Sequence, residues 1–290
     1  MSNAKYFSIE SVFHPTDFSE SSGIAFNHAL RIAVSNRSHL DILHVGSKRV
    51  DGEGWSEFPQ VRGMLERWDL LEKGSPKEAV SERLGMKVRK VELGGKKPLA
   101  AISNFLDMEP ADLIILATQG REGLPRWLEP SVSEHLARRA MIATLFVPAG
   151  ARGFVSRDRG EVDLVRVLIP VDHKPHPQAA IHAAGDFLRS VHAEASLVEA
   201  LFIGDTKRMP EVAPPLGLDC SFEKTARSGK PVDEIIKAAN EDKADLIVMA
   251  TEGHNGFLDA LRGSTTEQVL RRAPCPKSLK LKFSLVETFW

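Results

Sequence analysis

The chain contains an internal repeat, which constrains its fold more than any other feature. Residues 111–120 read ADLIILATQG and residues 244–253 read ADLIVMATEG, so seven of ten positions are identical at an offset of 133 residues. The same offset relates Lys97-Pro98 to Lys230-Pro231. A register kept over such a distance indicates a duplicated folding unit.

A second pair of motifs defines the two copies. Pro15-Thr16-Asp17 matches Pro170-Val171-Asp172 at an offset of 155, so the first copy holds 22 additional residues. We place this insertion near residues 46–85. The chain of 290 residues then divides into domains at 1–150 and 163–290, each long enough to bury its own core.

The hydrophobic pattern alternates between strand and helix periods. In the second copy, 166–171 and 195–203 are expected strands, and 178–191 carries apolar residues at helical spacing. Residues 246–250 form a continuous apolar run, typical of a central parallel strand. This pattern predicts an α/β fold of two doubly wound, Rossmann-like domains, each with a five-stranded parallel sheet. Residues 278–284 alternate leucine or phenylalanine with lysine, which predicts an edge strand.

Composition excludes several classes of function. Lys and Arg number 38 against 39 Asp and Glu, so no net field attracts nucleic acid or anionic lipid. No apolar run approaches the ~18 residues of a membrane span, and we expect a cytoplasmic protein. Cys220 and Cys275 are expected to be unbridged thiols. His173, His176 and His182 lack a cysteine or carboxylate at ligand spacing, so no metal site is expected.

Candidate ligand-binding residues follow two expected strands of the second copy. In doubly wound sheets, ligands bind beyond the carboxyl ends of strands where the winding reverses. Asp172 follows the first strand, and Ala250-Thr251-Glu252-Gly253 follow the fourth. Gly263-Ser264-Thr265 then begin a predicted helix, whose free N–H groups attract phosphate.

These motifs resemble the universal stress protein family. The resemblance rests on P-x-D after the first strand, on G-x9-G-[ST] after the fourth, and on Pro15-Thr-Asp-Phe-Ser-Glu20. It implies an adenine nucleotide alpha hydrolase-like fold and a stress-response module that binds ATP or a related adenine nucleotide, with or without magnesium. It also implies pairing of the two domains through their last strands and, as an alternative assembly, a homodimer.

The resemblance also implies the binding residues of the second domain. Asp172 would meet the amino edge of adenine, Val171 and Leu201 would line the base and ribose, and the glycines and hydroxyls would hold phosphates. The implied positions are Pro170, Val171, Asp172, Leu201, Ala250, Gly253, Gly263, Ser264 and Thr265. Ala250 stands where ATP-binding members carry the first glycine of G-x2-G-x9-G-[ST].

The first domain departs from this pattern. Pro130 occupies the position of Gly263, and proline has no N–H donor for a phosphate. The matching residues Asp17, Val45, Gly120 and Ser131 leave a weaker or base-only site. We therefore expect the second domain to bind most of the nucleotide.

Three functional readings remain open. No catalytic motif is present, which favours regulated binding over turnover. A weak ATPase would need Glu252 or Asp259 as its base or metal ligand. A structural or apolar-ligand protein would leave the phosphate loops empty and would use a cavity under the insertion. Asp17 and Asp172 have their own alternative roles as turn or helix-cap residues.

Overall fold

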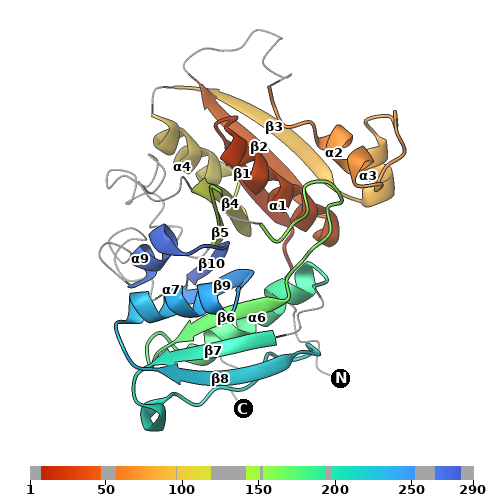
Figure 1. Cartoon of the computed structure of the whole chain (residues 1–290). Coiled ribbons are helices and arrows are strands. Elements are labelled where there is room, and N and C mark those ends of the chain that lie inside the picture. The colour runs from red at the N-terminus through yellow and green to blue at the C-terminus, as the bar shows by residue number, and fades with distance from the viewer. Residues whose placement is uncertain are drawn as a thin grey trace, which may run out of the picture.

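The computed structural model describes residues 8–46, 57–95, 97–118, 142–150, 153–193, 197–251 and 265–281. Within these ranges, ten strands form one sheet in the order β3-β2-β1-β4-β5-β10-β9-β6-β7-β8 (Figure 1). Strands within each half of this order run parallel, and the halves meet where β5 and β10 pair antiparallel. The predicted α/β class with five-stranded parallel sheets is confirmed.

The first half contains five strands and four described helices. The strands are β1 (Ser11–Thr16), β2 (His39–Gly46), β3 (Lys87–Gly94), β4 (Leu113–Thr118) and β5 (Ala143–Pro148). The helices are α1 (Glu20–Asn36), α2 (Val61–Arg67), α3 (Ala79–Leu84) and α4 (Pro98–Met108). Helices α2 and α3 belong to the insertion and lie beside β3 (Figure 1).

The second half repeats this arrangement without the inserted helices. Its strands are β6 (Arg166–Val171), β7 (Leu197–Ile203), β8 (Ser221–Arg227), β9 (Leu246–Thr251) and β10 (Lys277–Leu281). Its helices are α6 (Pro177–Ser190), α7 (Pro231–Glu241) and α9 (Thr265–Arg272), with the short 3-10 turn η3 (Thr206–Arg208) after β7.

Alternating strand residues build two cores on opposite faces of the sheet. Val12 of β1 belongs to the core that includes residues of α1, α6 and the insertion, whereas its neighbour Phe13 belongs to the core that includes residues of α4, α7 and α9. The apolar insertion residues Phe58, Leu65 and Trp68 are buried in the first of these cores. The insertion therefore covers a face of the sheet, and its apolar composition follows from that burial.

The repeated ADL motif has a structural explanation. Asp112 Oδ2 accepts hydrogen bonds from the backbone N–H groups of Glu10 and Ser11, both at 2.9 Å, and from Ser11 Oγ at 3.0 Å. In the second half, Asp245 Oδ2 accepts the N–H groups of Val165 and Arg166, both at 2.9 Å. Each aspartate precedes one central strand and binds the start of the neighbouring strand, which sets the register of β1 with β4 and of β6 with β9.

The predicted edge strand at 278–284 is wrong. Strand β10 has a parallel partner in β9 and an antiparallel partner in β5, where Leu279 pairs with Thr144. Lys277, one residue before the predicted segment, is only 1% exposed, and its Nζ donates to the carbonyl oxygen of Leu270 at 3.0 Å. Burial lowers the pKa of this lysine to about 8. The leucine–lysine alternation therefore does not mark a solvent-facing edge.

The segment between the halves packs onto the first half. The N–H of Phe154 donates to His28 Nε2 of α1 at 3.1 Å, and Trp68 Nε1 donates to the carbonyl oxygen of Arg157 at 3.0 Å. Val155 and Val162 form a short antiparallel bridge. None of the helices in the described ranges is long and apolar enough to span a membrane.

Candidate functional site

The winding of each half reverses beside its first strand. Strand β1 lies between β2 and β4, and β6 lies between β7 and β9. All these neighbours are parallel, so Asp172 after β6 and Thr251 at the end of β9 lie at the same edge of the sheet. We call this edge the carboxyl rim. The expected adjacency of β6 and β9 is confirmed.

Asp172 is exposed at the carboxyl rim of the second half. Among the described residues, its carboxylate accepts one hydrogen bond, from the N–H of His173 at 2.7 Å. Helix α6 begins later, at Pro177, and its N-cap residue His176 makes no side-chain capping bond. In the part of the chain that the structure describes, Asp172 therefore caps no helix and accepts no further hydrogen bond.

The apolar rim residues differ in depth. Val171 is buried, whereas Pro170 and Ala250 are half-buried. Leu201 is fully buried and lies opposite Pro170, below the rim. The ladder pairs Thr16 with His44 and Val171 with Phe202. The residue that corresponds to Val45 is therefore Ile203, which is half-buried at the rim and was missed from the sequence.

The predicted phosphate-binding positions lie largely outside the described residues. This holds for Gly253, Gly263 and Ser264, and for Gly120, Pro130 and Ser131 of the first half. The acid–base candidates Glu252 and Asp259 lie outside them as well. Thr265 is described as the half-buried first residue of α9. The helix start that follows the predicted phosphate loop is thus present.

Asp17, the counterpart of Asp172, is used locally. Its Oδ1 accepts the N–H of Ser19 at 3.0 Å and Ser19 Oγ at 2.6 Å. Ser19 in turn caps α1 by accepting the N–H of Ser22 at 3.2 Å. The turn-residue alternative therefore describes Asp17, whose carboxylate also supports the cap of α1.

Comparisons with known proteins decide the family. The model of the universal stress protein family matches residues 9–148 and 216–277. The chain belongs to the universal stress protein family. A universal stress protein of Methanocaldococcus jannaschii is 39% identical over 70 residues, which are 24% of this chain and 40% of that protein. The match thus spans about two fifths of the relative's length.

Solved structures share the fold over nearly the whole chain. A universal stress protein of Archaeoglobus fulgidus has a TM-score of 0.55 at 16% identity and covers 96% of this chain and 100% of its own. A putative universal stress protein of Pseudomonas aeruginosa has a TM-score of 0.58 at 17% identity, with 94% and 93% covered. At these identities the likeness shows the fold alone.

Two buried histidines of this universal stress protein, one in β1 and one in α1, lie in the interior of the first half. His14 Nδ1 is 3.0 Å from the carbonyl oxygen of Ile115, and His28 Nδ1 is 2.8 Å from that of Ile24. Burial lowers the pKa of both imidazoles to about 4. Both are fully enclosed, so they serve packing rather than contact with a ligand.

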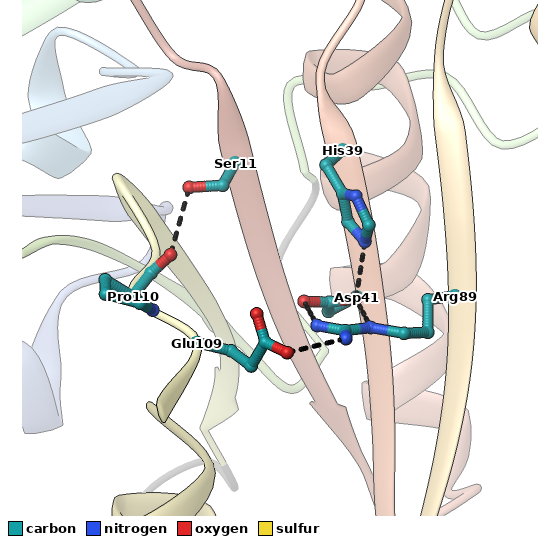
Figure 2. Close-up of polar contacts among 6 residues, drawn as sticks. All are labelled: Ser11, His39, Asp41, Arg89, Glu109 and Pro110. Carbon is teal, nitrogen blue, oxygen red and sulfur yellow. Dashed lines mark hydrogen bonds and ion pairs between the residues drawn. The ribbon is translucent and has the colours of Figure 1, made fainter. Parts of the chain in front are cut away.

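A charged network joins β2, β3 and α4 (Figure 2). Arg89 donates to both carboxylate oxygens of Asp41, at 2.7 and 2.8 Å, and to Glu109 at 2.9 Å. His39 Nε2 lies 2.8 Å from Asp41 Oδ1. These hydrogen bonds raise the pKa of Arg89 above its ordinary value. The network links the two strands to the end of α4 and supports the sheet. Figure 2 also shows Ser11 Oγ donating to the Pro110 carbonyl oxygen.

Metal and thiol chemistry have little support among the described residues. Within these ranges, no three His, Cys, Asp or Glu side chains lie close enough to hold a metal ion. Cys220 and Cys275 are free thiols. Burial raises the pKa of Cys275 to about 12, which keeps this thiol protonated.

Proposed function

We propose that this universal stress protein binds ATP or a related adenine nucleotide at the carboxyl rim of its second half. The observation that carries the proposal is the exposed Asp172 carboxylate, which lies where the winding reverses and has no capping duty. A carboxylate accepts hydrogen bonds and therefore suits the exocyclic amino group of adenine.

The surrounding residues fit a nucleotide. Ile203 and Val171 offer apolar side chains beside Asp172 for the base and ribose. The amino end of α9, which begins at Thr265, offers backbone N–H groups and a partial positive charge for phosphates. Gly253, Gly263 and Ser264 would complete the phosphate site as the family motif implies. A magnesium ion, when bound, would neutralise phosphate charge.

The two halves differ in their fitness for this role. Ser19 already uses the carboxylate of Asp17, and Pro130 removes an N–H donor from the first phosphate loop. We place the main site in the second domain, 163–290, and assign the first, 1–150, a supporting role. The β5–β10 ladder supports pairing of the domains within one chain, so a homodimer would need a different surface.

The proposed mode of action is regulated binding in the cytoplasm, without turnover. Nucleotide would order the rim of the second half and change the surface offered to partners. Asp172 would orient the base, and the start of α9 would hold the phosphates. No described side chain at this rim is positioned as a general base toward them.

Isothermal titration of the full-length chain with ATP tests the proposal. Loss of a hydrogen bond to a charged acceptor should weaken the affinity of Asp172→Ala about tenfold or more. Asp17→Ala is the matched control and should keep the wild-type affinity. Equal affinity of Asp172→Ala and wild type would remove the nucleotide site from this rim, and sustained phosphate release would contradict action without turnover.

A further inference from the structure

We propose that a cavity between α1 and the insertion is a second ligand site, which binds a small zwitterion with an apolar body, such as a free amino acid. The cavity has a volume of about 370 Å³ and lies between α1, α2 and the segment that joins the halves. This volume falls in the roughly 300–1,000 Å³ range of small-molecule sites. The proposal is independent of the nucleotide site.

Glycines on two helices keep the cavity open. Gly23 of α1 and Gly63 of α2 both line it. A Cβ built on Gly23 would meet no atom within 4 Å, and one on Gly63 would meet only Gln60 Cβ, at 3.8 Å. The space beside α1 is therefore left unfilled by the side chains around it.

A buried amide in the cavity wall lacks a partner. Asn27 lines the cavity and is only 4% exposed, yet its Oδ1 has no hydrogen-bond partner among the described residues. An unpaired buried polar group costs stability and calls for an explanation. The Oδ1 atom has almost no accessible surface, so a ligand ammonium group would satisfy it only after the amide rotates this oxygen toward the cavity.

Charges of both signs surround the same cavity. Arg67 and Arg157 line it together with Glu20 and Glu57, and all four residues are exposed. Within the described chain, no ion pair involves any of these four side chains. A ligand that carries both a carboxylate and an ammonium group matches this balance better than a simple anion.

The apolar wall accommodates the body of such a ligand. Ile24, Phe26 and Met64 contribute apolar side chains to the lining of the cavity. Met64 is an adaptable surface for side chains of different shape. The nucleotide positions Asp17 and Val45 do not line this cavity, whose walls come from the β1–α1 region and from the insertion.

Thermal denaturation and isothermal titration of the full-length chain test the proposal, with the standard L-amino acids and ATP as separate probes. At least one amino acid should raise the wild-type Tm at millimolar concentration. Gly23→Leu should abolish this shift without lowering the Tm of the free chain, because leucine favours helix more than glycine does. Asn27→Leu should raise the Tm of the free chain and weaken amino-acid binding about tenfold or more.

Further variants separate the site from its neighbours. Arg67→Ala should weaken amino-acid binding, whereas Arg62→Ala, on the same helix but outside the cavity, should not. ATP affinity should be unchanged in Gly23→Leu. The proposal is overturned if no amino acid binds the wild type, if binding survives Gly23→Leu, or if Gly23→Leu removes ATP binding instead.

Discussion

The imidazole ring of His44 stacks on the phenyl ring of Phe18, with ring centroids 4.1 Å apart. The second half holds the corresponding pair with the residue types exchanged, since His173 meets Phe202 edge-on at 5.8 Å. In the first half, Phe58 of the insertion adds an edge contact to Phe18 at 5.3 Å. Both halves thus have a histidine–phenylalanine contact at the carboxyl rim, and in the first half this contact also holds the insertion through Phe58.

Because Phe58 holds the insertion, we expect its removal to lower the stability of the chain without changing its affinity for nucleotide. Phe58 is 2% exposed, so Phe58→Ala leaves a cavity and should cost about 3–5 kcal/mol of unfolding free energy. Urea denaturation measures the loss. ATP affinity of the folded fraction should not change, because Phe58 lies in the other half from Asp172.

The two buried histidines, His14 and His28, predict that the free energy of unfolding depends on pH. The pKa of His14 and of His28 is about 4 in the folded chain against 6.5 ordinarily, so the unfolded state binds more protons between these values. Stability is therefore retained above pH 6.5 and falls as the pH drops toward 4, by on the order of 3 kcal/mol per histidine. Urea midpoints measured at several pH values check this.

Histidine variants provide the control for the pH effect. His14→Gln should reduce the slope of stability against pH below 6.5. His192→Gln removes an exposed histidine and should keep the wild-type slope. A slope unaffected by His14→Gln would exclude His14 as a source of the acid sensitivity.

Removing either of the two aspartates that set the strand register should lower the free energy of unfolding by a similar amount. Asp112→Ala and Asp245→Ala each leave strand-start N–H groups without their acceptor and should each cost about 1–3 kcal/mol. Asp158→Ala, at an exposed position between the halves, should be near neutral. Chemical denaturation compares the three. A neutral Asp245→Ala would show that the repeated motif does not set the register.

Substitution of two glycines between the halves distinguishes the cost of backbone strain from the cost of steric overlap. Gly150 and Gly160 have φ of +72° and +66°, but a Cβ on Gly150 meets nothing within 4 Å while one on Gly160 lies 2.3 Å from Trp68 Cδ2. Gly150→Ala should cost about 1 kcal/mol and Gly160→Ala clearly more. Equal losses in thermal unfolding would contradict the packing of this segment on Trp68.

Local patterns predict most of the fold. The apolar run at 246–250 and the helical spacing at 178–191 correspond to β9 and α6, because burial on both faces or on one face leaves a direct mark on sequence. The central place of β10 has no such mark. The position of β10 depends on its pairing with the distant strand β5. The lysines at 280 and 282 are compatible with an exposed edge strand and with a strand paired on both sides.

The candidate site shows a second limit of sequence reasoning. Thr16 and its ladder partner His44 are 28 residues apart, whereas Val171 and Phe202 are 31 apart. An alignment of the copies that ignores this difference carries Val45 onto the buried Ala200, next to the predicted Leu201, and not onto Ile203. Motif residues next to a strand end, such as Asp172, escape the error because no variable segment intervenes.

A crystal structure of the full-length chain with a non-hydrolysable ATP analogue tests the central claim most directly. The account predicts adenine at the carboxyl rim of the second half, with its amino nitrogen within hydrogen-bond distance of the Asp172 carboxylate and its phosphates at the start of α9. Analogue bound only in the first half, or a second-half rim closed by the protein's own side chains, would contradict it.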